Sequence, residues 1–148
     1  MKIKDNIIFN YYEKRFNLEL KGRITVIDNY EDNDKKLLCT LLSELKTLPQ
    51  YAEEYKYLIY FNNIFSELEL IKLNKTKQNK LYIIDHADNI LFGKDDIIKF
   101  ISLDRDNQYI IIGRCSFDLH LSPNYYAELK ENKNQFYLSY FSDVKGWN

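Results

Sequence analysis

The spacing of apolar residues predicts three strands at the start of the chain. Residues 3–9 and 15–20 alternate apolar and polar side chains, which indicates paired strands or a hairpin. Lys21 and Gly22 follow them as a turn signal. Residues 23–27 are mostly apolar and β-branched, a pattern typical of a strand that is buried in the middle of a sheet.

The next apolar positions follow helical spacing. Leucines over residues 37–48 lie on one helical stripe, and Pro49 comes directly after them as a stop signal. Residues 55–61 fit either a strand or a helix; we favour a strand, followed by a helix over residues 65–71. Residues 72–80 then form a polar, basic connector.

The second half of the chain continues to alternate strands with helices. Residues 81–85 are an apolar strand that ends in an acid. We expect Asp95 to cap a helix over residues 96–101, with acidic residues in the first turn as the helix dipole prefers. Residues 108–112 form another strand of the buried type, which Gly113 closes.

The chain is predicted to end in a β-hairpin, with strands over residues 125–130 and 135–141 and a turn over residues 131–134. Strands that alternate with helices in the middle of a chain imply right-handed βαβ units and a parallel sheet. The predicted fold class is therefore α/β, with a mainly parallel central sheet flanked by helices and antiparallel hairpins added at both termini. No internal repeat or linker divides the sequence, so we expect residues 1–148 to form a single domain.

The junction after the strand over residues 23–27 has the frame of a phosphate-binding loop. Such a loop follows the pattern G-x-x-x-x-G-K-[ST]. Lys35 fills the lysine position, but Asn29 and Asp34 occupy the two glycine positions and Lys36 occupies the Ser/Thr position. Glycines let backbone N–H groups close around phosphate oxygens, and the hydroxyl holds Mg²⁺. The loop also carries further carboxylates that would repel a triphosphate, namely Asp28, Glu31 and Asp32.

Two blocks of the sequence together resemble small P-loop NTPase-like proteins of AT-rich Gram-positive bacteria and phages. The first block is residues 18–27 with the loop that follows, and the second, residues 81–88, looks like a Walker B strand. The resemblance implies that Asp85 stands where Mg²⁺ is placed and that His86 replaces the glutamate that activates water. It implies a P-loop NTPase-like fold with no catalytic residue and no cofactor, in which the vestigial nucleotide site comprises Asn29, Asp34, Lys35, Lys36, Asp85 and His86.

The composition of the chain excludes several classes of protein. With 148 residues, of which 45% are hydrophobic, the chain suits one folded domain. A formal net charge of −1 argues against a strongly basic nucleic-acid binder and against an acidic DNA mimic. The two cysteines, Cys39 and Cys115, make no disulfide framework, and no signal peptide or long apolar run is present. We therefore expect a cytoplasmic protein with reduced thiols and no membrane segment.

Two alternative functions remain open. Asp85, His86 and Asp88 form a cluster of catalytic residue types that a metal-dependent enzyme would use, with His120 as a further candidate ligand. Their spacing suits a metal poorly, so a vestigial strand end is favoured. The second alternative is nucleic-acid binding through the basic connector, which lacks aromatic side chains to stack on bases and is better interpreted as a solvated loop. The lysines concerned are Lys72, Lys75, Lys77 and Lys80.

Tyrosine is unusually abundant, with 13 copies beside 9 phenylalanines. Tyrosine is enriched at protein interfaces, and the edge of a sheet can pair with a partner or a second copy. We therefore predict partner-binding residues on the terminal hairpin, namely Tyr125, Tyr126, Tyr137 and Tyr140. The sequence thus predicts a non-catalytic regulator or inhibitor that binds a protein. A phage or mobile-element protein directed against host defence, such as an anti-CRISPR protein, fits a chain of this kind.

The altered loop generates a prediction about nucleotides. ATP and GTP, with or without Mg²⁺, are expected not to bind at millimolar concentration near physiological ionic strength. A carboxylate within ~4 Å of a phosphate costs about 4 kcal/mol at an effective dielectric constant of about 20, and Lys35 and Lys36 offset only part of that cost. Isothermal titration and a thermal-shift series measure the binding. A micromolar dissociation constant that Lys35→Ala abolishes would contradict the prediction.

Overall fold

The computed structural model of the protein describes residues 4–28, 33–61, 79–87, 91, 93–113 and 125–141, with residues 33–35 as backbone only. These residues form eight strands, two α-helices and one short 3-10 helix. In chain order the elements are β1 (Asn6–Tyr11), β2 (Lys14–Glu19), β3 (Ile24–Asp28), α1 (Asn33–Glu44), η1 (Leu45–Thr47), β4 (Leu58–Phe61), β5 (Leu81–Ile84), α4 (Asp95–Leu103), β6 (Gln108–Gly113), β7 (Tyr126–Asn132) and β8 (Gln135–Tyr140).

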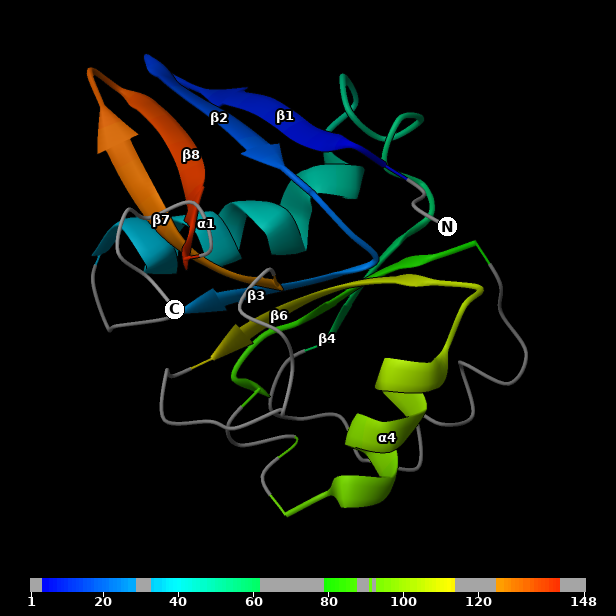
Figure 1. Ribbon diagram of the computed structural model, residues 1–148. Coiled ribbons are helices and arrows are strands. Elements are labelled where there is room, and N and C mark those ends of the chain that lie inside the picture. Colours follow the sequence, from blue (N-terminus) through cyan, green and yellow to red (C-terminus); the bar gives the residue numbers. More distant parts are fainter. Residues whose placement is uncertain are drawn as a thin grey trace.

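All eight strands belong to one mixed sheet, in the order β1-β2-β8-β7-β3-β6-β5-β4. From β7 to β4 in this order, each strand runs parallel to the next one. The other half of the sheet consists of two antiparallel hairpins, β1–β2 and β7–β8, joined where β2 pairs in parallel with β8. The sheet curls into a half-barrel (Figure 1).

The fold class predicted from the sequence, a P-loop NTPase-like parallel sheet flanked by helices, is wrong. Strands dominate the described residues, and two short helices, α1 and α4, accompany the curled sheet. The reason is a long-range pairing: Phe16 of the first hairpin is in register with Phe136 of the last, so the hairpins form half of the sheet instead of short additions to it. Local sequence patterns do not report such a contact. The helix predicted over residues 65–71 lies outside the described residues.

Several local elements do form where the apolar spacing predicted them. Both hairpins are confirmed, and the strands β3, β5 and β6 are buried along their whole length. The leucine-rich helix begins earlier than predicted and ends in the 3-10 helix η1. Of residues 55–61, only Leu58–Phe61 form a strand.

The predicted cap of the helix over residues 96–101 is wrong. Asp95 is the first residue of α4 itself, and Lys94 occupies the cap position without a side-chain hydrogen bond. The other end of α4 is held by Arg23, whose guanidinium donates to the carbonyl oxygens of Ile101 and Ser102, each at 2.9 Å. A cation at a helix C-terminus also interacts favourably with the helix dipole.

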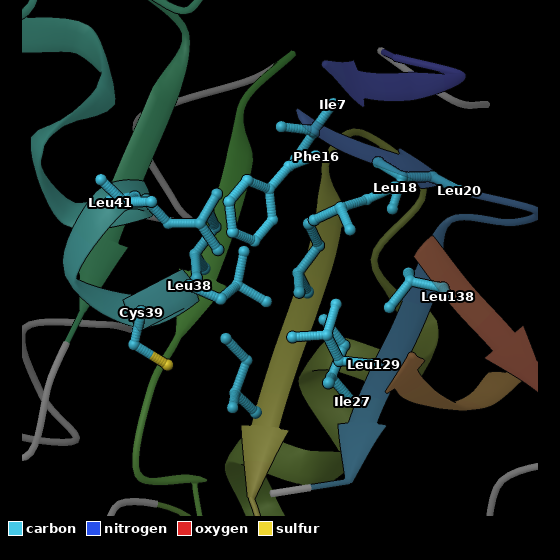
Figure 2. Packing of buried hydrophobic residues seen from close by; sticks show 14 of the residues in the cluster. Ile7, Phe16, Leu18, Leu20, Ile27, Leu38, Cys39, Leu41, Leu129 and Leu138 are labelled. Carbon is cyan, nitrogen blue, oxygen red and sulfur yellow. The ribbon is translucent and has the colours of Figure 1, made fainter. Parts of the chain in front are cut away.

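The sheet separates two apolar clusters, one packed with α1 and one packed with α4. Alternation along each strand explains the division, since neighbouring residues such as Val26 and Ile27 point to opposite faces. Figure 2 shows Leu38 and Leu41 of α1 on the side of the sheet from which Phe16 and Ile27 project, and all four belong to one apolar cluster. Helix α1 thereby covers the side on which the two hairpins bury their apolar residues.

The free edge of β1 is covered by tyrosine hydroxyls. Tyr55 is fully buried, and its hydroxyl both accepts from the N–H of Ile8 and donates to the C=O of Ile8, each at 2.9 Å. The hydroxyl of Tyr51 accepts from the N–H of Asn10 at 2.9 Å. These bonds replace the partner strand that an open edge would otherwise seek. They also tie the segment before β4, at one end of the strand order, to β1 at the other end.

Replacing Tyr55 by phenylalanine is expected to lower the free energy of unfolding by about 2 kcal/mol, because the N–H and C=O of Ile8 lose their partner. Tyr57→Phe is the matched control. Its hydroxyl is also buried, but it has no hydrogen-bond partner among the described residues, so its removal should be neutral or stabilising. Urea denaturation followed by circular dichroism measures both variants. Equal losses of stability in both would contradict the role assigned to Tyr55.

Candidate functional site

Asp85, which directly follows β5, accepts three hydrogen bonds. Asp85 is 6% exposed, and its Oδ2 accepts from the hydroxyl of Tyr60 at 2.5 Å. Its Oδ1 accepts from the backbone N–H of His86 at 2.7 Å and from the thiol of Cys39 at 3.6 Å. Because Tyr60 lies on β4 and Cys39 lies on α1, one carboxylate joins two strands and a helix. We call these three side chains, Cys39, Tyr60 and Asp85, the Asp85 junction.

Both side-chain donors in the Asp85 junction keep their protons at neutral pH. Burial, and then the negative charge of Asp85, raise the pKa of the Cys39 thiol to about 12. Burial and the hydrogen bond to Asp85 raise the pKa of Tyr60 well above its usual value. A cysteine nucleophile needs the opposite environment, one that favours the thiolate. The junction is therefore built to hold protons and to fix neighbouring elements.

His86 adjoins this junction in an unusual backbone conformation. Its φ is +53°, in the left-handed region that is uncommon for residues other than glycine. Its ring is half exposed, and Nε2 lies 3.7 Å from Oδ2 of Asp85. An ion pair over this distance requires a protonated imidazole. The structure thus brings together two predicted site residues, Asp85 and His86.

The other positions of the predicted vestigial site are placed only in part. Asn29 lies outside the described residues, Asp34 and Lys35 are described by backbone alone in the first turn of α1, and Lys36 is exposed. Just before them, Asp28 ends β3 with 2% exposure, and neither of its carboxylate oxygens has a hydrogen-bond partner among the described residues.

Asp28 and Asp85 lie on opposite faces of the sheet. Strand alternation places Asp28 on the same side as Val26, which belongs to the cluster that packs with α4. Asp85 instead contacts Cys39 on α1. The two acids at the ends of β3 and β5 therefore do not combine into one site.

The residues of the two alternative functions fall mainly outside the described chain. This holds for Asp88 and His120 of the metal hypothesis and for three of the four lysines of the nucleic-acid hypothesis, with Lys80 as the exception. Within the described ranges, no group of three or more histidine, cysteine or acidic side chains is arranged to hold a metal ion.

A second carboxylate cluster, centred on the half-buried Asp104, lies at the end of α4. Asp104 accepts hydrogen bonds from the hydroxyl of Tyr109 at 2.6 Å, the side-chain amide of Asn107 at 2.9 Å and the backbone N–H of Asp106 at 2.9 Å. Like the Asp85 junction, this cluster contains a hydrogen bond from a tyrosine hydroxyl to a carboxylate. Its hydrogen bonds fix the turn between α4 and β6.

The four tyrosines predicted to bind a partner differ in exposure. Tyr140 is 2% exposed, and its hydroxyl donates to the carbonyl of Glu19 at 2.6 Å. Tyr125 and Tyr126 are half-buried against the α4-side cluster. Tyr137 is 44% exposed and points away from the core. Of the four, Tyr137 alone presents a largely open ring.

A groove of about 480 Å³ lies beside Tyr137 on the outer face of the hairpins. Its walls come from the start of β1, the second half of β2 and the middle of β8. We call it the hairpin groove; its lining residues are Asp5, Asn6, Asn17, Glu19, Leu20, Tyr137 and Leu138. The groove was not predicted from the sequence, although the alternation of Asn17 and Glu19 with the buried Phe16 and Leu18 places the two polar residues on one solvent-facing side of β2.

Comparison of the chain with protein-family models, with curated proteins and with solved structures gave no match. The resemblance inferred from the two sequence blocks therefore remains a prediction. In the described part of the chain, neither α-helix combines the length and apolar character that crossing a membrane requires.

The high pKa of Cys39 predicts a thiol that reacts slowly. In a Cys115→Ser background at pH 8, iodoacetamide is expected to alkylate Cys39 roughly a hundredfold or more slowly than free cysteine. The rate should rise as the pH approaches 12. Asp85→Asn removes a charge and an acceptor that raise this pKa, so it should speed alkylation at pH 8, whereas Asp104→Asn should not. Alkylation of the folded parent at the rate of free cysteine would contradict the assignment.

Proposed function

We propose that this protein is a non-catalytic binding protein whose partner, another protein, docks on the two hairpins. The observation that carries the proposal is the distribution of exposed apolar side chains. Among the described residues, the large exposed hydrophobic side chains are Tyr12 at 88%, Leu103 at 63%, Tyr137 at 44% and Tyr11 at 37%. All three tyrosines belong to the hairpins.

These tyrosines suit recognition better than folding. Tyr11 and Tyr12 meet edge to face, with ring centroids 4.6 Å apart at the β1–β2 turn. The β7–β8 turn lies beside them, because the N–H of Arg15 donates to the carbonyl of Asn134 at 2.9 Å. Tyrosine supplies a large contact area at a low entropy cost and is frequent among the residues that dominate binding energy. The hairpin ends therefore present a ready aromatic contact surface.

The chemistry of the Asp85 junction supports the non-catalytic part of the proposal. The carboxylate of Asp85 accepts three hydrogen bonds, and Cys39 and Tyr60 hold their protons. These groups stabilise the contact between α1, β4 and β5. The sequence is rich in Lys, Asn, Ile and Tyr and has only 4 Gly and 2 Pro, which suggests coding by an AT-rich genome such as that of a phage or mobile element. On that ground the class that we propose is a regulator or inhibitor of the anti-defence type that acts in the cytoplasm.

The test is capture of a partner from the lysate of an AT-rich Gram-positive bacterium, followed by native mass spectrometry of the complex. We expect a stoichiometric protein complex whose affinity falls about thirtyfold with Tyr12→Ser, the loss that removal of a dominant interface residue produces. Leu103→Ser on α4 is the matched control, since it also removes a large exposed apolar side chain. It should leave binding unchanged. Absence of a stoichiometric partner, or a partner lost with Leu103→Ser alone, would overturn the proposal.

A further inference from the structure

The hairpin groove has a polar floor that is set by strand register. Asn6 of β1 lies directly opposite Glu19 of β2. Arg15 and Phe16 of β2 pair in parallel with the first two residues of β8, so continued register places Asn17 beside Tyr137. Two amides and a carboxylate therefore share the groove with one exposed aromatic ring. Their side chains lie on the face opposite the apolar core, which leaves them available to a ligand.

The charges around the groove favour a cation. Among the described residues, two carboxylates line it, those of Asp5 and Glu19, and no cationic side chain does. Glu19 is exposed and takes part in no side-chain hydrogen bond or ion pair with the described residues. Arg15 shares its strand and its face but is not part of the lining. Glu19 thus presents to the groove a carboxylate that no described side chain has already bound.

The nearest lysines are held by other groups. Lys4 lies 2.8 Å from the carboxylate of Glu54, and Lys130 lies 3.0 Å from that of Glu128. The ammonium group of Lys21 lies over the ring of Tyr140, 4.7 Å from its centroid. None of these three lysines is among the described residues that line the groove.

We propose that the hairpin groove binds an arginine side chain of the partner protein, an inference that rests on the proposed function. A guanidinium is planar, carries five N–H donors and stacks on aromatic faces. Tyr137 offers the ring, Glu19 offers a carboxylate for charge-assisted hydrogen bonds, and the amide oxygens of Asn6 and Asn17 offer further acceptors. A volume of about 480 Å³ accommodates the side chain and part of its backbone.

Chemical-shift mapping with isotope-labelled protein tests this proposal directly. The probe is a short glycine–serine peptide with a central arginine, and the comparison peptide carries citrulline, which has nearly the same shape without the charge. We expect the arginine peptide to shift the resonances of Asn6, Asn17 and Glu19, and the citrulline peptide to bind at least about tenfold more weakly. The affinity for arginine should fall as salt is added.

Two variants and a control complete the experiment. Glu19→Gln should weaken arginine binding about tenfold and Tyr137→Leu about threefold, and both sites are exposed, so the fold should persist. Glu13→Gln makes the same charge change at an exposed position outside the groove and should have no effect. Equal binding of arginine and citrulline peptides, or binding that Glu19→Gln does not change, would overturn the inference.

The outcomes separate the two proposals. If the peptide fails to bind but a captured partner still depends on Tyr12, the arginine site is wrong and the binding function stands. If the arginine peptide binds but no stoichiometric partner is found, the proposed binding function is wrong. If, in that case, free arginine also binds as tightly as the peptide, the groove is a small-molecule site, and the inference of a protein ligand is wrong as well.

Discussion

The two edge strands of this curled sheet are tied to one another by tyrosine hydroxyls, and Tyr55 makes the larger share of the contact. The hydroxyl of Tyr55 forms hydrogen bonds with both the N–H and the C=O of Ile8 on β1. Tyr55 itself lies just before β4, which is at the opposite end of the strand order. Its ring is fully buried, and the ammonium group of Lys4 lies over it, 5.3 Å from the centroid. An unsatisfied edge strand attracts other chains, so this tie also protects the edge of β1 from pairing with another chain.

The same closure decides which face of the hairpins meets solvent. Curling turns the apolar side of β1, β2 and β8 toward α1, where Phe16 stacks between Phe9 and Phe136 with ring centroids 4.7 and 4.5 Å apart. Strand alternation then sends the polar residues, with Tyr137, outward. The groove is thus a consequence of the core: it lies outside because the stacked phenylalanines lie inside.

The sequence predicts those parts of the structure that local patterns determine, and it misses contacts between residues that are far apart along the chain. The hairpins pair strands that are neighbours in the chain, and the buried strands β3, β5 and β6 are nearly continuous apolar runs, so local apolar spacing predicts both. The pairing of β2 with β8 joins residues more than a hundred positions apart, and the predicted fold class failed there. The site shows the same division: the sequence identified Asp85, whereas its partners Cys39 and Tyr60 come from distant elements.

Residue type and accessibility answer different questions about a site. Asp85 and His86 are residue types that are common in catalytic sites. The carboxylate of Asp85, however, is 6% exposed and accepts hydrogen bonds from Cys39 and Tyr60, so it serves to join α1, β4 and β5. Glu19 and Tyr137 form no recognisable motif, but they are exposed and flank a groove. Because a ligand competes only for groups that the fold has not already bound, the outer face of the hairpins is where recognition can occur.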